Sequence, residues 1–378
     1  MKNLIIHSGN LAIGGQEKMT IELLKVLSPT KYKVLFLIEE HNGSENYYEK
    51  EIPNYINYKF LTTETFMDTL KKYKKHKNFI SKIIYSYLLK KKKKIAINNL
   101  KKEMEFADTI IDYDGGLLRN INLLDLNNKS IVFWGHLGDG GPISHQKKRE
   151  NFLKYTHVVA INSLMKQGFL TNHKNSTFKV ELIYNFMDEK IVIDASTENI
   201  DEDLGEYIVN VGALTKVKNH KLLIEAFHKL VLLGREEKLV LIGNGREKEN
   251  IEKLIKNLNL ENKVILLGRK ENPFKYIKNS LFYVNTSYLE GMPLTVIEAM
   301  ILKKAIICTK NSGSIEVLGN SEFGILVDHN LEKLVFEMKK MLIDKEHRTF
   351  FEKKSEKRSF DFLSEKGRHN IEAFIDSL

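Results

Sequence analysis

Short apolar runs alternate with amphipathic stretches along most of the chain. Apolar, β-prone runs occupy residues 4–7, 34–38, 108–112, 130–134, 157–162, 180–184, 208–212, 239–243 and 264–268. Helical spacing of apolar residues follows several runs, as at Met19, Leu23 and Leu27 after the first. Strands that alternate with helices indicate parallel sheets with right-handed crossovers, which bind ligands at the carboxyl ends of their strands.

The alternating pattern falls into two parts. A chain of 378 residues exceeds the size at which one core usually stops growing, so two domains are expected. Residues 194–203, D-A-S-T-E-N-I-D-E-D, are acidic and polar, which is typical of a linker. We therefore predict a first domain at 1–185, a linker at 186–205, a second domain at 206–357 and a helical segment at 358–378.

The segment 282–298, F-Y-V-N-T-S-Y-L-E-G-M-P-L-T-V-I-E, carries the main candidate site. It reads as a strand, a polar turn and the start of a helix, with Pro293 at the first helical position. The unpaired N–H groups of that first turn form an anion site, and Gly291 lets a ligand approach the backbone. Carboxylates at Glu290 and Glu298 accept hydrogen bonds from hydroxyls, so the segment indicates a sugar nucleotide.

Glu290, seven intervening residues and Glu298 resemble the signature of family-four retaining glycosyltransferases, which have the GT-B fold. The resemblance implies an α/β chain of two Rossmann-like domains facing across a cleft, with the last helix crossing back onto the first domain. It also implies that Glu290 addresses the donor sugar and Glu298 the nucleotide ribose. The donor diphosphate would be held by the backbone between them, at Gly291, Met292, Pro293, Leu294 and Thr295.

Two further segments of the second half are similar to this family. V-G-A-L-T-K-V-K-N-H places Lys218 on the family lysine that clamps the donor diphosphate, but Ala213 stands where the family has an arginine. Either another group, such as Lys216 or Arg269, supplies the missing charge, or the chain handles the donor less well. The turns at Gly243, Gly268 and Arg269 look like the loops that face the nucleotide base.

The first half contributes two more matches. Gly14-Gly15-Gln16-Glu17 resembles a G-G-A-E segment whose glycine amides face the donor. His136 lies where a strand breaks into the glycine-rich residues 137–141, in the position of a family histidine that faces the donor sugar. An ordinary turn and a locally paired histidine are the alternatives from the residues alone.

Asp112 and Asp114 end a strand with the D-x-D spacing that metal-dependent glycosyltransferases of the other major fold use for a divalent ion. A second such pair, Asp201 and Asp203, lies in the expected linker, so the pattern arises easily. We expect no metal site, and we expect Asp114 to line the acceptor cleft.

The net charge is +10, and lysines are dense from Lys71 to Lys94, where Ile80, Ile83 and Tyr87 recur at near-helical spacing. Such a basic amphipathic helix suits the surface of an anionic membrane; a solvated face in a lysine-rich chain is the alternative. The sequence has no evident aromatic platform for nucleic acid and no apolar run long enough to span a bilayer. Cys308 follows an apolar run and is expected in the core.

The resemblance implies transfer of an α-linked hexosyl or N-acetylhexosaminyl group, with retention, from a nucleotide sugar that is expected to be UDP-linked. The acceptor implied by the resemblance is a lipid-linked or surface polysaccharide of bacteria. Glu290, Lys218 and His136 are the expected catalytic residues, with no cofactor beyond the nucleotide sugar. We expect a cytoplasmic protein in peripheral contact with the membrane. The alternatives are a non-catalytic partner subunit, suggested by Ala213, and a nucleotide-sugar epimerase or hydrolase.

Overall fold

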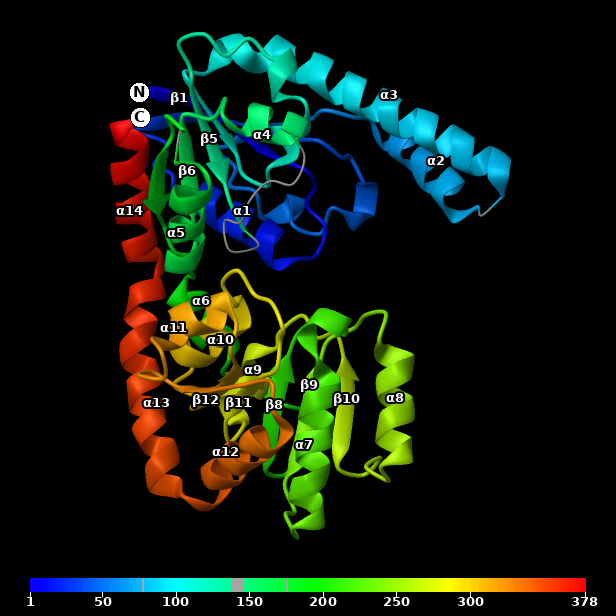
Figure 1. Ribbon diagram of the computed structural model, residues 1–378, viewed down its shortest axis with the longest axis vertical. Helices are drawn as coiled ribbons and strands as arrows, with labels where there is room; N and C mark the ends of the chain where they lie inside the picture. Colours follow the sequence, from blue (N-terminus) through cyan, green and yellow to red (C-terminus); the bar gives the residue numbers. More distant parts are fainter. Residues whose placement is uncertain (77, 137–145, 175) are drawn as a thin grey trace. The chain divides into compact units, whose positions relative to one another are not determined.

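The structure, a computed structural model, describes residues 1–76, 78–136, 146–174 and 176–378 (Figure 1). The glycine-rich run expected at 137–141 lies outside the described residues. The chain divides into two compact units. Unit 1 contains Met1–Ile183 and Arg368–Leu378, and unit 2 contains Tyr184–Gly367.

Unit 1 is built on a seven-stranded parallel sheet with the order β3-β2-β1-β4-β5-β6-β7. Its strands are β1 (Lys2–Ser8), β2 (Tyr32–Ile38), β3 (Asn57–Phe60), β4 (Thr109–Asp112), β5 (Ser130–Trp134), β6 (His157–Ala160) and β7 (Lys179–Leu182). Its helices include α1 (Gly15–Val26), α2 (Glu64–Lys75), α3 (Phe79–Glu103), α4 (Gln146–Phe152) and α5 (Ser163–Asn172). Short 3-10 turns fill the remaining connections: η1 (Gly43–Glu45), η2 (Glu49–Glu51), η3 (Met104–Phe106), η4 (Gly116–Arg119) and η5 (Ile121–Leu123).

Unit 2 is built on a six-stranded parallel sheet with the order β10-β9-β8-β11-β12-β13. Its strands are β8 (Tyr207–Val211), β9 (Lys238–Ile242), β10 (Val264–Gly268), β11 (Tyr283–Asn285), β12 (Ile306–Thr309) and β13 (Ile325–Val327). Its helices are α6 (Glu189–Ala195), η6 (Lys216–Lys218), α7 (His220–Leu232), α8 (Lys248–Asn257), α9 (Phe274–Asn279), α10 (Leu294–Ile301), α11 (Ser312–Leu318), α12 (Leu331–Ile343), α13 (Lys345–Ser359) and η7 (Phe360–Phe362). Its core includes Cys308, which is fully buried on β12 as expected.

The last helix, α14 (Ser364–Ser377), begins in unit 2 and ends in unit 1. In unit 1 the Lys2 ammonium donates to the Ile375 carbonyl at 2.6 Å, and the Tyr32 hydroxyl donates to Asp376 at 2.7 Å. In unit 2 the amide of Ser364 donates to the Met187 carbonyl at 2.9 Å. Each end of the helix is therefore anchored in a different unit.

The alternation of strands and helices predicted from the sequence is confirmed, and the structure adds one strand and one helix to it. The sequence shows no β-prone run between those at 34–38 and 108–112, but Asn57–Phe60 form the edge strand β3. Its first three side chains are exposed, so it lacks the buried face that gives a strand its sequence pattern. The expected linker contains helix α6, because the Asp188 carboxylate caps it by accepting from the amide of Lys190 at 2.9 Å.

None of the described helices is both long and apolar enough to cross a membrane.

Candidate active site

In both sheets the strand order reverses next to the first strand of the unit. The reversal separates β1 from β4 in unit 1 and β8 from β11 in unit 2. At such a switch point the connections leave in opposite directions, which opens a crevice at the carboxyl ends of the two strands. The candidate residues of each unit lie after these strands.

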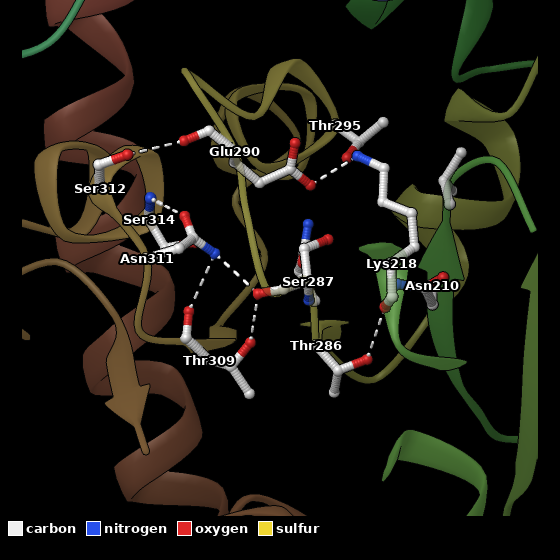
Figure 2. Close-up of polar contacts among 12 residues, drawn as sticks. Asn210, Lys218, Thr286, Ser287, Glu290, Thr295, Thr309, Asn311, Ser312 and Ser314 are labelled. Carbon is white, nitrogen blue, oxygen red and sulfur yellow. Dashed lines mark hydrogen bonds and ion pairs between the residues drawn. The ribbon is translucent and has the colours of Figure 1, made fainter. Parts of the chain in front are cut away.

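Lys218 and Glu290 meet at the switch point of unit 2 (Figure 2). The Lys218 ammonium donates to Glu290 Oε1 at 2.5 Å, and the side chain of Glu290 is 11 % exposed. The two residues come from different loops that are joined by their backbones. Thr286 Oγ1 donates to the carbonyl of Lys218 at 3.2 Å, and the Tyr288 amide donates to the carbonyl of Val217 at 2.8 Å.

Helix α10 begins immediately after this pair. Pro293 is its N-cap and Leu294 its first residue, so the prediction of Pro293 at the first helical position was one residue off. The cap offers no side-chain acceptor, and the first-turn amides have no partner within the helix. The side chain of Thr295 is held in place, because its Oγ1 accepts a hydrogen bond from the buried hydroxyl of Tyr283 at 2.8 Å. Glu298 lies one turn further on and is 4 % exposed.

The turn before α10 is held against the start of α11. Ser312 Oγ and the amide of Gly313 both donate to the Glu290 carbonyl, at 3.0 and 3.1 Å. A Cβ atom on Gly313 would lie 2.8 Å from the carbonyl oxygen of Gly291, which is closer than a carbon can approach. The glycine thus lets α11 support the backbone of the turn directly. The contact gives Ser312 a structural role in this turn.

The three loops on the other side of β8 also touch through their backbones. A Cβ atom on Gly243, which has a φ of +153°, would lie 1.9 Å from the carbonyl oxygen of Gly212. The Gly243 amide donates to the Gly268 carbonyl at 2.8 Å, and Gly268 has a φ of +65°. Both glycines are therefore required by the backbone, whatever they bind.

Ala213 is exposed at the carboxyl end of β8, where the family resemblance calls for an arginine. Lys216 and Arg269 are exposed as well. Lys216 lines a cavity of about 450 Å³ between η6 and α8, together with Glu247 and Tyr288. Ala213 therefore does not supply the positive charge that an arginine would place at the end of β8.

Unit 1 carries the other predicted residues. Gly14 is the N-cap of α1 and Gly15 its first residue, so their amides belong to a helix start without a side-chain cap. His136 follows β5, and its ring packs on Tyr113 with centroids 4.5 Å apart. Burial lowers the pKa of His136 to about 4, so the imidazole is neutral at pH 7. Among the described residues its Nε2 atom is buried without a hydrogen-bond partner.

Asp112 and Asp114 lie at the switch point of unit 1, and the structure adds His7 to them. His7 Nδ1 lies 3.3 Å from Asp112 Oδ1 and 4.0 Å from Asp114 Oδ1. Burial alone would disfavour the imidazolium, but the hydrogen bond and charge of Asp112 and the charge of Asp114 raise the pKa of His7. Burial in turn raises the pKa of Asp114. His7 was missed because it lies inside a strand with apolar neighbours.

These carboxylates are already bonded within the protein. Asp112 accepts from the Tyr155 hydroxyl at 2.5 Å and from the amide of Leu117 at 3.2 Å. Asp114 accepts from the amides of Gly9 at 2.5 Å and Gly116 at 2.9 Å. His7, Asp112 and Asp114 have potential ligand atoms within 4.8 Å of one another, but a histidine between two carboxylates can balance their charge without an ion.

The structure therefore joins Lys218, Glu290 and the start of α10 into one site in unit 2. It gathers Asp114 and His7 at the corresponding edge of unit 1, which also carries Gly14, Gly15 and His136.

Known proteins are similar to parts of this chain. The sequence model of the family described as glycosyl transferases group 1 matches residues 195–358. A relative from Campylobacter jejuni, N-acetylgalactosamine-N,N'-diacetylbacillosaminyl-diphospho-undecaprenol 4-alpha-N-acetylgalactosaminyltransferase, is 36% identical over 198 residues, which cover 52% of this chain and 53% of the relative. An uncharacterized glycosyltransferase of Methanocaldococcus jannaschii is 30% identical over 213 residues, 51% of each chain. The chain thus spans about half the length of these curated relatives.

The whole chain is similar in fold to solved glycosyltransferase structures. Anabaena HepE in complex with UDP and glucose superposes with a TM-score of 0.77 at 16% identity, over 100% of both chains. Staphylococcus aureus TarM, solved with UDP and glycan ligands, superposes with a TM-score of 0.75 at 14% identity, over 98% of this chain and 99% of TarM. Both units therefore have the parallel α/β architecture of GT-B proteins. Residues 195–358 are therefore similar to the group 1 glycosyltransferases, and this stretch contains the site that joins Lys218 to Glu290 at the start of α10.

Proposed function

We propose that this protein is a retaining α-glycosyltransferase that moves a hexosyl or N-acetylhexosaminyl group from a UDP-linked sugar to a lipid-linked or surface-polysaccharide acceptor. The observation that carries the proposal is the contact between Lys218 and Glu290 beside the uncapped start of α10. A cation, a carboxylate and a helix N-terminus at one switch point match the three parts of a sugar diphosphate.

The charges suggest how the donor binds. The ammonium of Lys218 and the first-turn amides of α10 would face the diphosphate, and Glu290 would accept hydrogen bonds from sugar hydroxyls. Glu298, further along the same helix, would accept from the ribose. The negative charge of the leaving diphosphate grows in the transition state. Hydrogen-bond donors that the contacts of Thr295 and Glu290 already hold in place would therefore lower the activation barrier of the transfer.

His136 would act as a neutral group in this scheme. Its low pKa keeps the ring uncharged at pH 7, so a ring N–H would donate to a sugar hydroxyl or to the leaving oxygen without adding a full charge. Asp114, held by two amides, would face the acceptor. The amides of Gly14 and Gly15 would face the donor from unit 1. Gly243, Gly268 and Arg269 would face the base.

Our proposal includes no cofactor and no catalytic metal, since Lys218 and the helix start would supply the positive charge that a divalent ion supplies elsewhere. Activity in excess chelator should equal activity in added magnesium. A strict requirement for a divalent ion would refute this part of the proposal.

The names of two relatives support the proposed acceptor. The relative from Campylobacter is named for a diphospho-undecaprenol acceptor, and one from S. aureus for capsular polysaccharide biosynthesis. We infer a cytoplasmic enzyme that contacts an anionic membrane through the region from Lys71 to Lys94.

Ala213 favours a second candidate, a non-catalytic subunit that works with another glycosyltransferase. A charge-assisted hydrogen bond of the kind an arginine makes to phosphate contributes about 1.5 to 3 kcal/mol. Its absence would weaken donor binding by roughly 10- to 100-fold.

Thermal unfolding with a panel of UDP-, GDP- and ADP-sugars tests the donor site. A ligand at about 100 times its Kd stabilises the folded state by roughly 2.7 kcal/mol. We expect stabilisation by one nucleotide class that is lost in Glu298→Ala and kept in Glu261→Ala, which removes an exposed carboxylate near β10. Stabilisation by no donor would favour the non-catalytic subunit.

Nucleotide release then separates the remaining alternatives. Release of UDP that requires a glycan acceptor identifies a transferase, and release without an acceptor identifies a hydrolase. The anomeric configuration of the product, read by NMR, decides between retention and inversion.

A further inference from the structure

A cavity of about 450 Å³ opens between the starts of helices α7 and α8 in unit 2. The two helices pack beside each other on the core of that unit, and the loop that precedes each helix reaches the cavity. Sites for small molecules usually enclose about 300 to 1,000 Å³, so the cavity is large enough for a ligand. The described residues that line it do not include Lys218, Glu290 or Glu298, which the proposed function assigns to the donor.

The wall of this cavity is positively charged. Lys216, Lys221 and Lys253 line it, and Glu247 is the single acidic residue among its described lining residues. Lys221 reaches Glu225 at 3.6 Å, whereas Lys216 and Lys253 form no ion pair within the part of the chain that the structure describes. Neither helix has a side-chain cap at its start, so the positive ends of both helices add to the lysines. The wall therefore suits an anionic group.

Other side chains of the wall suit a sugar ring. Asn219 and Asn257 line the cavity with carboxamides, which both donate hydrogen bonds to hydroxyl groups and accept them. Tyr288 contributes an aromatic ring that is 55% exposed and is stacked on His329, with centroids 4.8 Å apart. Leu254 adds an apolar side chain. Because a sugar ring has apolar C–H faces and hydroxyl groups at its edge, it matches an aromatic ring beside carboxamides.

His220 is a buried polar residue of the same wall. Its side chain is 3% exposed, and neither ring nitrogen has a hydrogen-bond partner among the residues that the structure describes. Burial and the charge of Lys218 lower the pKa of His220 to about 4, so the ring is neutral and offers one N–H donor and one acceptor. Buried polar groups are normally hydrogen-bonded, so an unpaired imidazole in the wall of a cavity indicates a polar ligand.

Hydrogen bonds within unit 2 already hold the wall in place. Thr286 Oγ1 donates to the carbonyls of Lys218 and Asn219, at 3.2 and 3.0 Å. The Tyr288 amide donates to the carbonyl of Val217 at 2.8 Å. These bonds join two segments that line the cavity. A ligand that binds there loses little free energy to ordering of the protein.

We propose that this cavity binds an acidic saccharide, which is a sugar that carries a carboxylate or a phosphate group. Lys221 and Lys253 pair with the acidic group, His220 hydrogen-bonds to a hydroxyl, and Tyr288 packs on a ring face. The inference goes beyond the proposed function and does not depend on it, because the cavity holds the saccharide apart from the donor and requires no transfer.

Calorimetry and ligand-observed NMR with the full chain test the proposal. The acidic probes are tetrasaccharides of hyaluronan and alginate, which carry carboxylates, and glucose 1-phosphate, which carries a phosphate. Cellotetraose is the neutral control, and inorganic phosphate is the control for an anion without a sugar. We expect at least one acidic probe to bind more tightly than both controls, and we expect salt to weaken this binding. The probe that binds best identifies the source of the charge.

Two variants and a matched control locate the binding. Lys221→Gln/Lys253→Gln should bind the saccharide roughly 10- to 100-fold more weakly, and His220→Phe about 2- to 10-fold more weakly. His220→Phe keeps a ring and removes an unpaired buried polar group, so its Tm should not fall. Lys339→Gln/Lys353→Gln removes two exposed lysines from α12 and α13 and should bind like the unmodified chain.

Several results would overturn the proposal. These are failure of every acidic probe to bind, equally tight binding of cellotetraose or inorganic phosphate, and equal losses in the test and control lysine variants. Displacement of the saccharide by UDP would also overturn it, since the cavity would then belong to the donor site. Stabilisation by UDP-sugars is measured on Lys221→Gln/Lys253→Gln and should equal that of the unmodified chain. Its loss in this variant alone would mean that these lysines serve the donor, which contradicts a separate site.

Discussion

Replacing Gly313 by alanine perturbs the donor turn without touching a charged group. The φ of Gly313 lies outside the left-handed region, so the backbone accepts alanine, and a helix interior favours alanine over glycine by up to about 1 kcal/mol. The new Cβ, however, would lie 2.8 and 2.9 Å from the carbonyl oxygens of Gly291 and Glu290. Ordinary contact begins at 3.4 Å, so the turn must move by about 0.6 Å.

The displacement acts on the backbone that the proposal places around the diphosphate. Misplacement of a binding group by 1 Å costs on the order of 100-fold in rate, so about 0.6 Å predicts a loss on the order of 10-fold in kcat/KM. Overpacking costs about 1 to 3 kcal/mol, which the gain in helix propensity partly offsets, so the protein should stay folded. Steady-state kinetics with varied donor, together with the UDP-dependent shift in Tm, measures the effect.

Gly234→Ala is the matched control for stability. Gly234 has a φ of +80° and open space around it, so alanine there costs roughly 1 to 2 kcal/mol of strain and leaves the donor turn in place. We expect Gly234→Ala to lower Tm and keep kcat/KM. Unchanged kcat/KM and UDP affinity in Gly313→Ala would refute the reasoning, and so would equal losses in both variants.

Four further results are expected. Lys218→Met should weaken UDP-sugar binding by roughly 10- to 100-fold in calorimetry, and Lys221→Met, which removes an exposed lysine from α7, should not. Ala213→Arg should strengthen the same binding by a similar factor; no gain would mean that another group already neutralises the phosphate. The folded-state pKa of His7 is raised, so the stability that His7 adds is full below its unfolded pKa near 6.5 and is lost as pH rises through the folded value. The gap in urea midpoint between the unmodified chain and His7→Asn should therefore shrink from pH 6 to pH 9, and a constant gap would contradict the assignment. NMR titration should give His136 a midpoint near 4, and a midpoint near 6.5 would show that the ring is solvated.

The parts of this fold that follow from sequence are those in which one side-chain pattern decides the local structure. Buried parallel strands read as short apolar runs because both their faces are covered, as with Ile5 and Ile6 of β1 or Leu239 and Val240 of β9. The turn from Glu290 to Glu298 was predictable because its proline indicates a helix start, its glycine allows a ligand to approach the backbone, and its two carboxylates indicate hydroxyl ligands.

Other features depend on contacts between distant segments, which no local pattern contains. His7 lies 105 residues from Asp112, and nothing around it in sequence marks it as different from a core residue. Lys218 and Glu290 are 72 residues apart, and the family resemblance rather than spacing connected them. The sequence does not reveal why Gly313 must be a glycine, since the reason is the 2.8 Å distance between a Cβ atom there and the carbonyl oxygen of Gly291, which belongs to another segment of the chain.

The lysine-rich region shows how far a helical pattern alone can go. The pattern places Ile80, Ile83 and Tyr87 on one face, and they are exposed, but α3 also pairs with α2, which buries Leu88 between the two helices. Leu88 packs against Met67 because α2 lies beside α3, and the sequence of α3 alone does not determine the position of α2.

The double anchoring of α14 bears on the order in which the chain folds as it is synthesised. Unit 2 is a continuous stretch of chain, whereas unit 1 needs Arg368–Leu378 as well as its first 183 residues. Ile371 and Ile375 of α14 are fully buried in the completed protein, so the surface of unit 1 that they cover stays exposed until translation has passed them. Although domains generally fold in the order in which they emerge from the ribosome, the second unit of this protein can finish before the first.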